Sequence, residues 1–176
     1  MSTIDLIILG FLLDRRMNAY ELASFIAEKQ IGRFLKISTP AIYKSCNRLY
    51  AAGFLDGKAV KEGGLPEKTV YSINKKGRKR FLALMEGFSS HFAPFFLDCN
   101  AFIWNIEKVE KKHGLKMLEN LRDELSALDK WIPQHEKEES ENLSFAAKAI
   151  IKQYRMTISA ILRWSKELIK DYNKLK

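Results

Sequence analysis

The stretch from Thr39 to Gly53 constrains the fold most, because it carries the signals of a complete short helix. Thr39 can cap the first turn with its hydroxyl, and Pro40 stands where a missing N–H costs nothing. Gly53 can adopt the left-handed conformation that follows a last helical turn. At about 100° per residue, one face of this helix is apolar, and it consists of Ile42, Cys46 and Leu49.

The opposite face of this helix carries bases and small residues but no acid: Pro40, Lys44, Asn47, Arg48 and Ala51. Lysine, asparagine and arginine can hydrogen-bond to base edges and phosphates, and small residues leave room for entry into a groove. The face therefore predicts contact with a nucleic acid, with an ordinary solvated helix face as the alternative.

The charge of the chain favours the nucleic-acid interpretation and lies mainly in the N-terminal half. A formal net charge of +9 over 176 residues suits a polyanionic partner. Residues 1–90 hold 15 lysines and arginines against 8 aspartates and glutamates, whereas residues 91–176 hold 15 against 13. The positive excess is thus in the half that contains the 39–53 helix.

Two further helices are expected before this one. An apolar run over 4–13 predicts a buried helix started by Ser2 or Thr3, and Asn18 can cap a second helix over 19–29. Residues 14–18 form the break between them.

After Gly53 the hydrophobic period changes from helical to strand-like. The runs 54–61 and 68–74 partly alternate around a turn cluster at 62–67, which predicts a β-hairpin. Asn74 can then cap a basic helix. Three helices, a hairpin and a helix follow one another in the order of a winged helix-turn-helix, whose third helix enters the major groove.

The C-terminal half is expected to be helical. Aromatic residues crowd 88–106, where we expect a helix to begin at Pro94 and Trp104 to be buried. Lys111 to His113 before Gly114 suit a C-terminal turn. A heptad-like pattern then predicts an amphipathic helix that Pro133 kinks or ends, with apolar positions at Leu118, Leu121, Leu125, Leu128 and Ile132.

A long last helix is expected over 142–172, after an acidic, solvated tip at 136–141. A helix near 30 residues must lie along something, and a second subunit is the simplest candidate. We therefore predict a mainly α fold with an α+β wing, built from a winged helix-turn-helix DNA-binding domain (1–88) and a long-helix dimerisation domain (89–176).

The first half of the chain resembles the PadR family of bacterial transcriptional regulators. The matching motifs are the apolar helix 4–13 and the segments 18–22, 39–43, 48–49, 53–55, 70–74 and 76–78. The long C-terminal half is similar to the branch of that family with an extended helical dimerisation domain. The resemblance implies a homodimer with two winged helices, often a repressor that a small aromatic or phenolic ligand releases from DNA. Lys44 and Cys46 depart from the family pattern, so no operator sequence is carried over.

Candidate DNA-binding residues follow from these patterns and from the resemblance. Lys44, Asn47 and Arg48 form the base-facing and groove-facing set. Tyr20 and Tyr43 match family positions near the DNA backbone, with packing at the edge of the helical core as the alternative. Phosphate contacts are predicted from the hairpin, and the full set is Tyr20, Ser38, Thr39, Tyr43, Lys44, Asn47, Arg48, Lys61 and Lys68.

Four aromatic residues of the second half could line an effector pocket or, alternatively, form interface core: Phe95, Trp104, Trp131 and Trp164. A dimer-interface cavity is where an effector would be sought.

Other functional classes find little support. The histidines lack metal-ligand spacing, and no phosphate loop, dinucleotide glycine pattern or nucleophile elbow occurs. We expect no enzyme, no metal and no cofactor. Cys46 and Cys99 are expected to be reduced thiols of a cytoplasmic protein without a membrane span. A winged-helix module that docks an acidic protein partner, without sequence-specific DNA binding, is the main alternative function.

Overall fold

The computed structural model describes residues 1–61, 67–92, 94, 96–139 and 143–175, and of residues 33 and 132–139 it describes the backbone alone. The chain divides into two compact units, Met1–Pro94 and Phe95–Lys176. The division falls six residues after the boundary predicted at 88/89.

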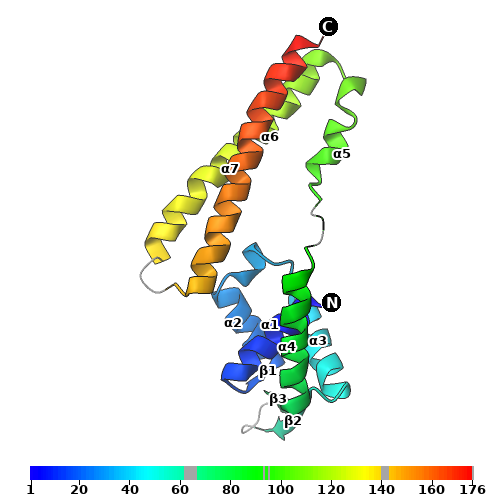
Figure 1. Cartoon of the computed structure of the whole chain (residues 1–176), viewed down its shortest axis with the longest axis vertical. Coiled ribbons are helices and arrows are strands. Elements are labelled where there is room, and N and C mark those ends of the chain that lie inside the picture. The colour runs from blue at the N-terminus through cyan, green and yellow to red at the C-terminus, as the bar shows by residue number, and fades with distance from the viewer. Residues whose placement is uncertain (62–66, 93, 95, 140–142, 176) are drawn as a thin grey trace. The chain divides into compact units, whose positions relative to one another are not determined.

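The first unit contains helices α1 (Thr3–Asp14), α2 (Ala19–Glu28), α3 (Thr39–Ala51) and α4 (Lys75–Ser90), with a short 3-10 helix η1 (Ile31–Arg33) after α2 (Figure 1). Three strands form the wing: β1 (Met17–Asn18), β2 (Leu55–Val60) and β3 (Lys68–Ile73). This is the predicted winged helix-turn-helix order, and the mainly helical fold class with a small antiparallel sheet is confirmed.

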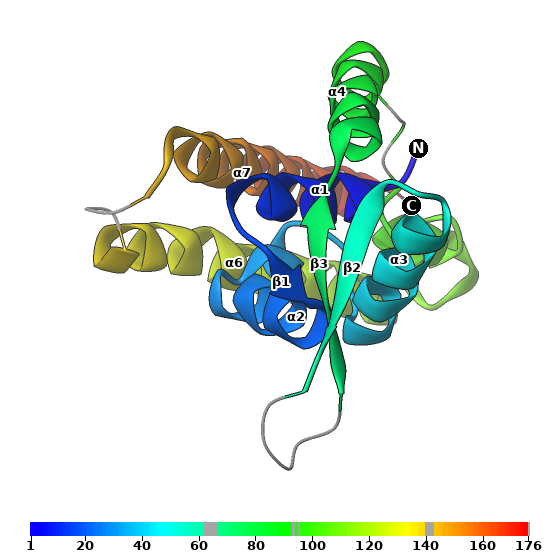
Figure 2. The same ribbon diagram turned by 90° about the horizontal axis from the view of Figure 1, so that it is seen from below.

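The sheet is antiparallel, with the strand order β1-β3-β2 (Figure 2). β2 and β3 pair from Leu55 opposite Ile73 to Val60 opposite Lys68. Met17 pairs with Tyr71 on the other edge of β3, so the hairpin is tied to the chain just before α2. β1 was not predicted from the sequence, because its two residues fall within the expected break between two helices at 14–18.

Local capping signals were predicted correctly at three helix starts. Ser2 accepts a bond from the backbone N–H of Asp5 at the start of α1, and Asn74 accepts one from Gly77 at the start of α4. Asn18 and Glu21 form a reciprocal capping box at α2, each side chain bonded to the other's backbone N–H.

The core of the first unit lies between α1, α2, α3, α4 and the sheet. Its fully buried members come from separate parts of the sequence, including Ile8, Leu22, Ile42, Cys46 and Leu84. Gly77 lets α4 approach the residue just before β2, because a Cβ at Gly77 would stand 2.2 Å from the carbonyl oxygen of Phe54.

The second unit is built on two long helices, α6 (Lys111–Glu139) and α7 (Phe145–Lys174), which run alongside each other (Figure 1). They are preceded by a short helix α5 (Cys99–Ile103) and a 3-10 helix η2 (Ile106–Lys108). Ile106, Leu118 and Tyr172 form the buried centre of this unit, and the Tyr172 hydroxyl donates to the Ile106 carbonyl oxygen at 3.3 Å.

Three expectations for this half are wrong. No helix begins at Pro94, because the next one begins at Cys99, and Trp104 is 87% exposed rather than buried. Residues 111–113 form the start of α6 and not the predicted C-terminal turn. The helix runs on through Gly114, whose missing side chain leaves room for the Tyr172 ring. Pro133 does not end α6, which continues to Glu139, and the alternative of a kink at this residue stays a prediction. The acidic tip 136–141 lies outside the residues whose side chains the structure describes.

Candidate nucleic-acid interface

The third helix is amphipathic as predicted, with Ile42, Cys46 and Leu49 buried. Gly53 has a φ of 72°, the left-handed conformation expected just past the helix end. The helix is therefore fixed by its apolar face to the core, and Ser45 is the polar residue of α3 that is buried with that face.

The start of α3 differs from the prediction. Ser38, not Thr39, is the residue that precedes the first turn, and its side chain makes no capping hydrogen bond. Thr39 and Pro40 are the first helical residues, and all three are exposed. The first backbone N–H groups of a helix lack partners within it, so this end presents backbone donors beside two hydroxyls.

Lys44 lies in the middle of the outward face of α3 and is exposed. Within the residues that the structure describes, its ammonium has no hydrogen bond or ion pair. A free ammonium on a helix face can contact a phosphate or a guanine edge.

Asn47 is exposed but is tied to the wing. The buried Tyr71 hydroxyl of β3 donates to Asn47 Oδ1 at 3.1 Å. Burial, and secondarily the neighbouring Cys46 and Tyr50, raises the pKa of Tyr71, so this hydroxyl stays protonated near neutral pH. The tyrosine rings of Tyr50 and Tyr71 also meet, with centroids 5.8 Å apart. These contacts hold the flank of α3 against the hairpin.

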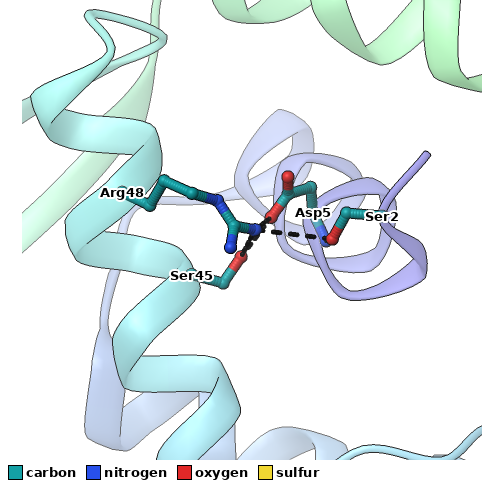
Figure 3. A network of polar contacts seen from close by, with 4 residues as sticks. All are labelled: Ser2, Asp5, Ser45 and Arg48. Atoms are coloured by element: carbon teal, nitrogen blue, oxygen red, sulfur yellow. Dashed lines mark hydrogen bonds and ion pairs between the residues drawn. The ribbon is translucent and has the colours of Figure 1, made fainter.

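Arg48 is tied in the other direction, to α1 (Figure 3). Its Nη2 forms an ion pair with Asp5 and lies 3.3 Å from Ser45 Oγ and 3.4 Å from Ser2 Oγ. The Ser45 hydroxyl also donates to the same Asp5 oxygen. The Asp5 side chain is 8% exposed and the Arg48 side chain 52%. The helical period predicted Arg48 on the outward face, but its pairing with Asp5 was not predicted. A single early charge in an apolar run is a signal that this charge has a partner.

The remaining predicted DNA-binding residues lie on the same unit. Tyr20 on α2 is 70% exposed and Tyr43 on α3 is 40% exposed, so neither is packed within the core. Lys61 is exposed just after β2, and Lys68 begins β3 with its side chain partly buried. The structure thus supplies exposed tyrosines and wing lysines on the unit that carries α3.

The described members of the predicted aromatic set lie on separate elements of the second unit. Trp131 lies on α6 and Trp164 on α7, and the bond from Ser159 to Asp129 fixes the register of the two helices. Trp131 therefore lies level with a position on α7 about seven residues from Trp164, which is about 10 Å along the helix. Trp104 is exposed next to η2, and Phe95 lies outside the described residues.

Other kinds of site find no support in the described part of the chain. It contains no group of three or more metal-ligating side chains. None of its helices combines the length and the apolar character needed to cross a bilayer. Burial raises the pKa of the Cys46 thiol to about 11, which disfavours the reactive thiolate.

The comparison with solved structures identifies the fold. Bacillus subtilis PadR in complex with operator DNA superposes with a TM-score of 0.77 at 13% identity, covering 97% of this chain and 99% of that one. The same protein with p-coumaric acid gives a TM-score of 0.73 at 11% identity, covering 99% of each chain. The Vibrio cholerae virulence activator AphA gives 0.71 at 20% identity, covering 97% of this chain and 98% of that one.

The PadR-like transcriptional regulator BC1756 from Bacillus cereus is similar too, with a TM-score of 0.70 at 16% identity over 97% of this chain and 98% of that one. No family model and no curated protein matches the sequence. The structural likeness extends over both units of the chain. This chain therefore has the fold of the PadR and PadR-like transcriptional regulators.

Proposed function

We propose that this chain is a homodimeric, sequence-specific transcription regulator that binds double-stranded DNA through α3. The observation that carries the proposal is the outward face of α3, which has no acidic residue and presents the unpaired ammonium of Lys44. A helix with such a face, set beside a hairpin in a winged helix-turn-helix, suits the major groove.

The parts around Lys44 support distinct kinds of contact. Lys44 and the outward edge of Asn47 suit base edges, while the uncapped start of α3 with Ser38 and Thr39 suits a phosphate. Tyr20, Tyr43, Lys61 and Lys68 supply further hydrogen-bond donors for the flanking backbone. In this arrangement two subunits read a pseudo-palindrome whose half-sites lie about 34 Å, or a multiple of that distance, apart.

The second unit supports the proposed dimer. Its two long helices expose large apolar side chains that a second copy could cover, including Met117, Leu128, Phe145, Ile150, Met156 and Trp164. Sedimentation equilibrium should give twice the chain mass of 20.4 kDa. A stable monomer in solution would contradict the dimer.

We propose in addition that the regulator is a repressor that a small aromatic effector releases from DNA. The support is that Bacillus subtilis PadR was solved both with operator DNA and with p-coumaric acid. Titration of p-coumaric acid as a probe should quench tryptophan fluorescence and weaken operator binding together. Unchanged fluorescence and unchanged DNA affinity would contradict control by this class of compound.

DNA binding is tested by selecting a preferred duplex from a random pool and measuring it by gel shift with non-specific competitor and a salt titration. Lys44→Ala should weaken specific binding by about 1–3 kcal/mol and relax base preference at one position. Lys79→Ala removes the same charge from the exposed side of α4 and is the matched control. Equal effects of the two variants would contradict readout by α3. Failure to bind any duplex would favour a module that docks an acidic protein.

A further inference from the structure

We infer that Asp5 is a positioning residue that withholds Arg48 from DNA, so that the recognition helix reads through Lys44 and Asn47 while Arg48 stays bound to α1. This inference rests on the proposed DNA-binding function of α3. It assigns a role to an acidic residue outside α3, on a helix that makes no predicted DNA contact.

The guanidinium of Arg48 is held by groups from two helices. One nitrogen of the Arg48 guanidinium lies against Asp5, Ser45 and Ser2 at once, and Figure 3 shows these groups converging on it from α3 and α1. The remaining guanidinium nitrogens point in directions fixed by the planarity of the group. Arg48 cannot extend fully away from α3 while this contact holds.

The carboxylate that Arg48 contacts is buried. The Asp5 carboxylate is almost completely removed from water, and Arg48 is the base that the described residues place against it. Moving Arg48 onto a DNA phosphate would leave the buried carboxylate with the Ser45 hydroxyl as its one side-chain partner among the described residues, which is strongly unfavourable. The phosphate that Arg48 would gain is at the solvated surface, where a single contact is worth less.

Lys44 and Arg48 differ in their surroundings, although both lie on α3. Lys44 stands one turn before Arg48 on the same helix, and within the described residues no acid faces it. The two bases are therefore unequal, although the sequence places them on one face. Lys44 is available to the DNA, and Arg48 neutralises the carboxylate of α1.

The test compares the salt dependence of binding to a non-specific duplex for full-length variants. Asp5→Asn keeps the shape of the side chain but removes its charge, which releases Arg48. Affinity should rise by about three- to tenfold at low salt, and the slope of log K against log salt should steepen by about 0.9, the value for one added phosphate contact. Asp14→Asn, at the exposed end of the same helix, is the charge-matched control and should leave the slope unchanged.

Arg48→Gln provides the second arm. If Asp5 withholds Arg48, this variant should keep the wild-type slope, and Asp5→Asn combined with Arg48→Gln should lose the gain of Asp5→Asn. A slope that becomes shallower by about 0.9 in Arg48→Gln alone would show that Arg48 already contacts DNA, and would overturn the inference. This arm remains decisive even if Asp5→Asn does not fold.

Lys44→Ala in the same series separates the inference from the proposed function. A shallower slope for Lys44→Ala together with a shallower slope for Arg48→Gln overturns the role of Asp5 and leaves α3 as the reader. A wild-type protein that binds no duplex overturns the proposed function itself.

Discussion

The two cysteines differ in burial, and this difference should appear in their chemistry. Cys46 is fully buried on the inner face of α3, whereas Cys99 at the start of α5 is partly exposed. The thiolate is the reactive form, and burial raises the pKa of the Cys46 thiol from 9.0 to about 11. In the native protein, Ellman's reagent should modify Cys99 rapidly and Cys46 only on unfolding.

The same raised pKa makes stability depend on pH. The folded protein keeps the Cys46 proton at pH values where the unfolded chain has released it. The contribution of this thiol to the free energy of unfolding is therefore complete below pH 9.0 and is lost as the pH rises toward 11. Urea unfolding across this range should show the decline, and Cys46→Ala should make it shallower. An identical pH dependence in both proteins would contradict this account.

Gly114 allows a double-mutant test of the contact between α6 and α7. A Cβ at this position would stand 2.3 Å from the Tyr172 hydroxyl, so Gly114→Ala should lower the free energy of unfolding by about 1–2 kcal/mol despite the better helix propensity of alanine. In the Tyr172→Phe background the loss should shrink, because the nearest atom is gone. Equal losses in both backgrounds would show that the tyrosine hydroxyl is not the obstacle.

Residue-scale features of the candidate site were only partly predictable from the sequence. Exposure of Lys44 followed from helical periodicity, which is local. Periodicity could not predict the partners of Arg48 and Asn47, because Asp5 lies 43 positions before Arg48 and Tyr71 lies 24 positions after Asn47. Periodicity gives the direction of a side chain from its helix, but not what another element brings to meet it.

At the level of elements, the two helix starts at α2 and α3 make a matched pair. Asn18 caps α2 through a reciprocal box, whereas Ser38 stands at the corresponding position of α3 without a side-chain bond. Asn18→Ala should lower the free energy of unfolding by about 1–2 kcal/mol, and Ser38→Ala by clearly less. Urea unfolding in the absence of DNA measures both, and equal losses would contradict the assignment of the caps.

Element prediction succeeded where the signal was local and failed where it was not. The capping residues of α1, α2 and α4 indicate where these helices begin, and each acts on a backbone group within four positions of itself. β1 has two residues and exists because it pairs with β3, more than fifty positions later, so no local period reveals it. Gly114 resembles a helix end in sequence, yet its actual role depends on a tyrosine from the other long helix.

At the scale of the whole molecule, the small core of the second unit bears on the proposed dimer. Two helices of about 30 residues bury few side chains completely, while Phe145 is 89% exposed. In the proposed dimer, the thermal midpoint should rise with protein concentration, as expected when unfolding is linked to dissociation. A midpoint independent of concentration would contradict obligate dimerisation.

A surface variant locates the interface. Trp164→Glu on α7 should weaken the dimer and lower the midpoint, because it places a charge on the apolar surface that the partner is proposed to cover. Asn173→Glu, an exposed position near the end of the same helix, adds the same charge as the control. Sedimentation velocity distinguishes the two, and equal behaviour would place the interface elsewhere.

Asn18 takes part in the sheet and caps a helix at the same time. Asn18 pairs with Val70 in the sheet and, through the capping box, also fastens the opening turn of α2. The wing and this helix consequently share a single mechanical anchor. Under an external load applied to the hairpin strands, sheet and helix should come apart in one rupture event rather than two.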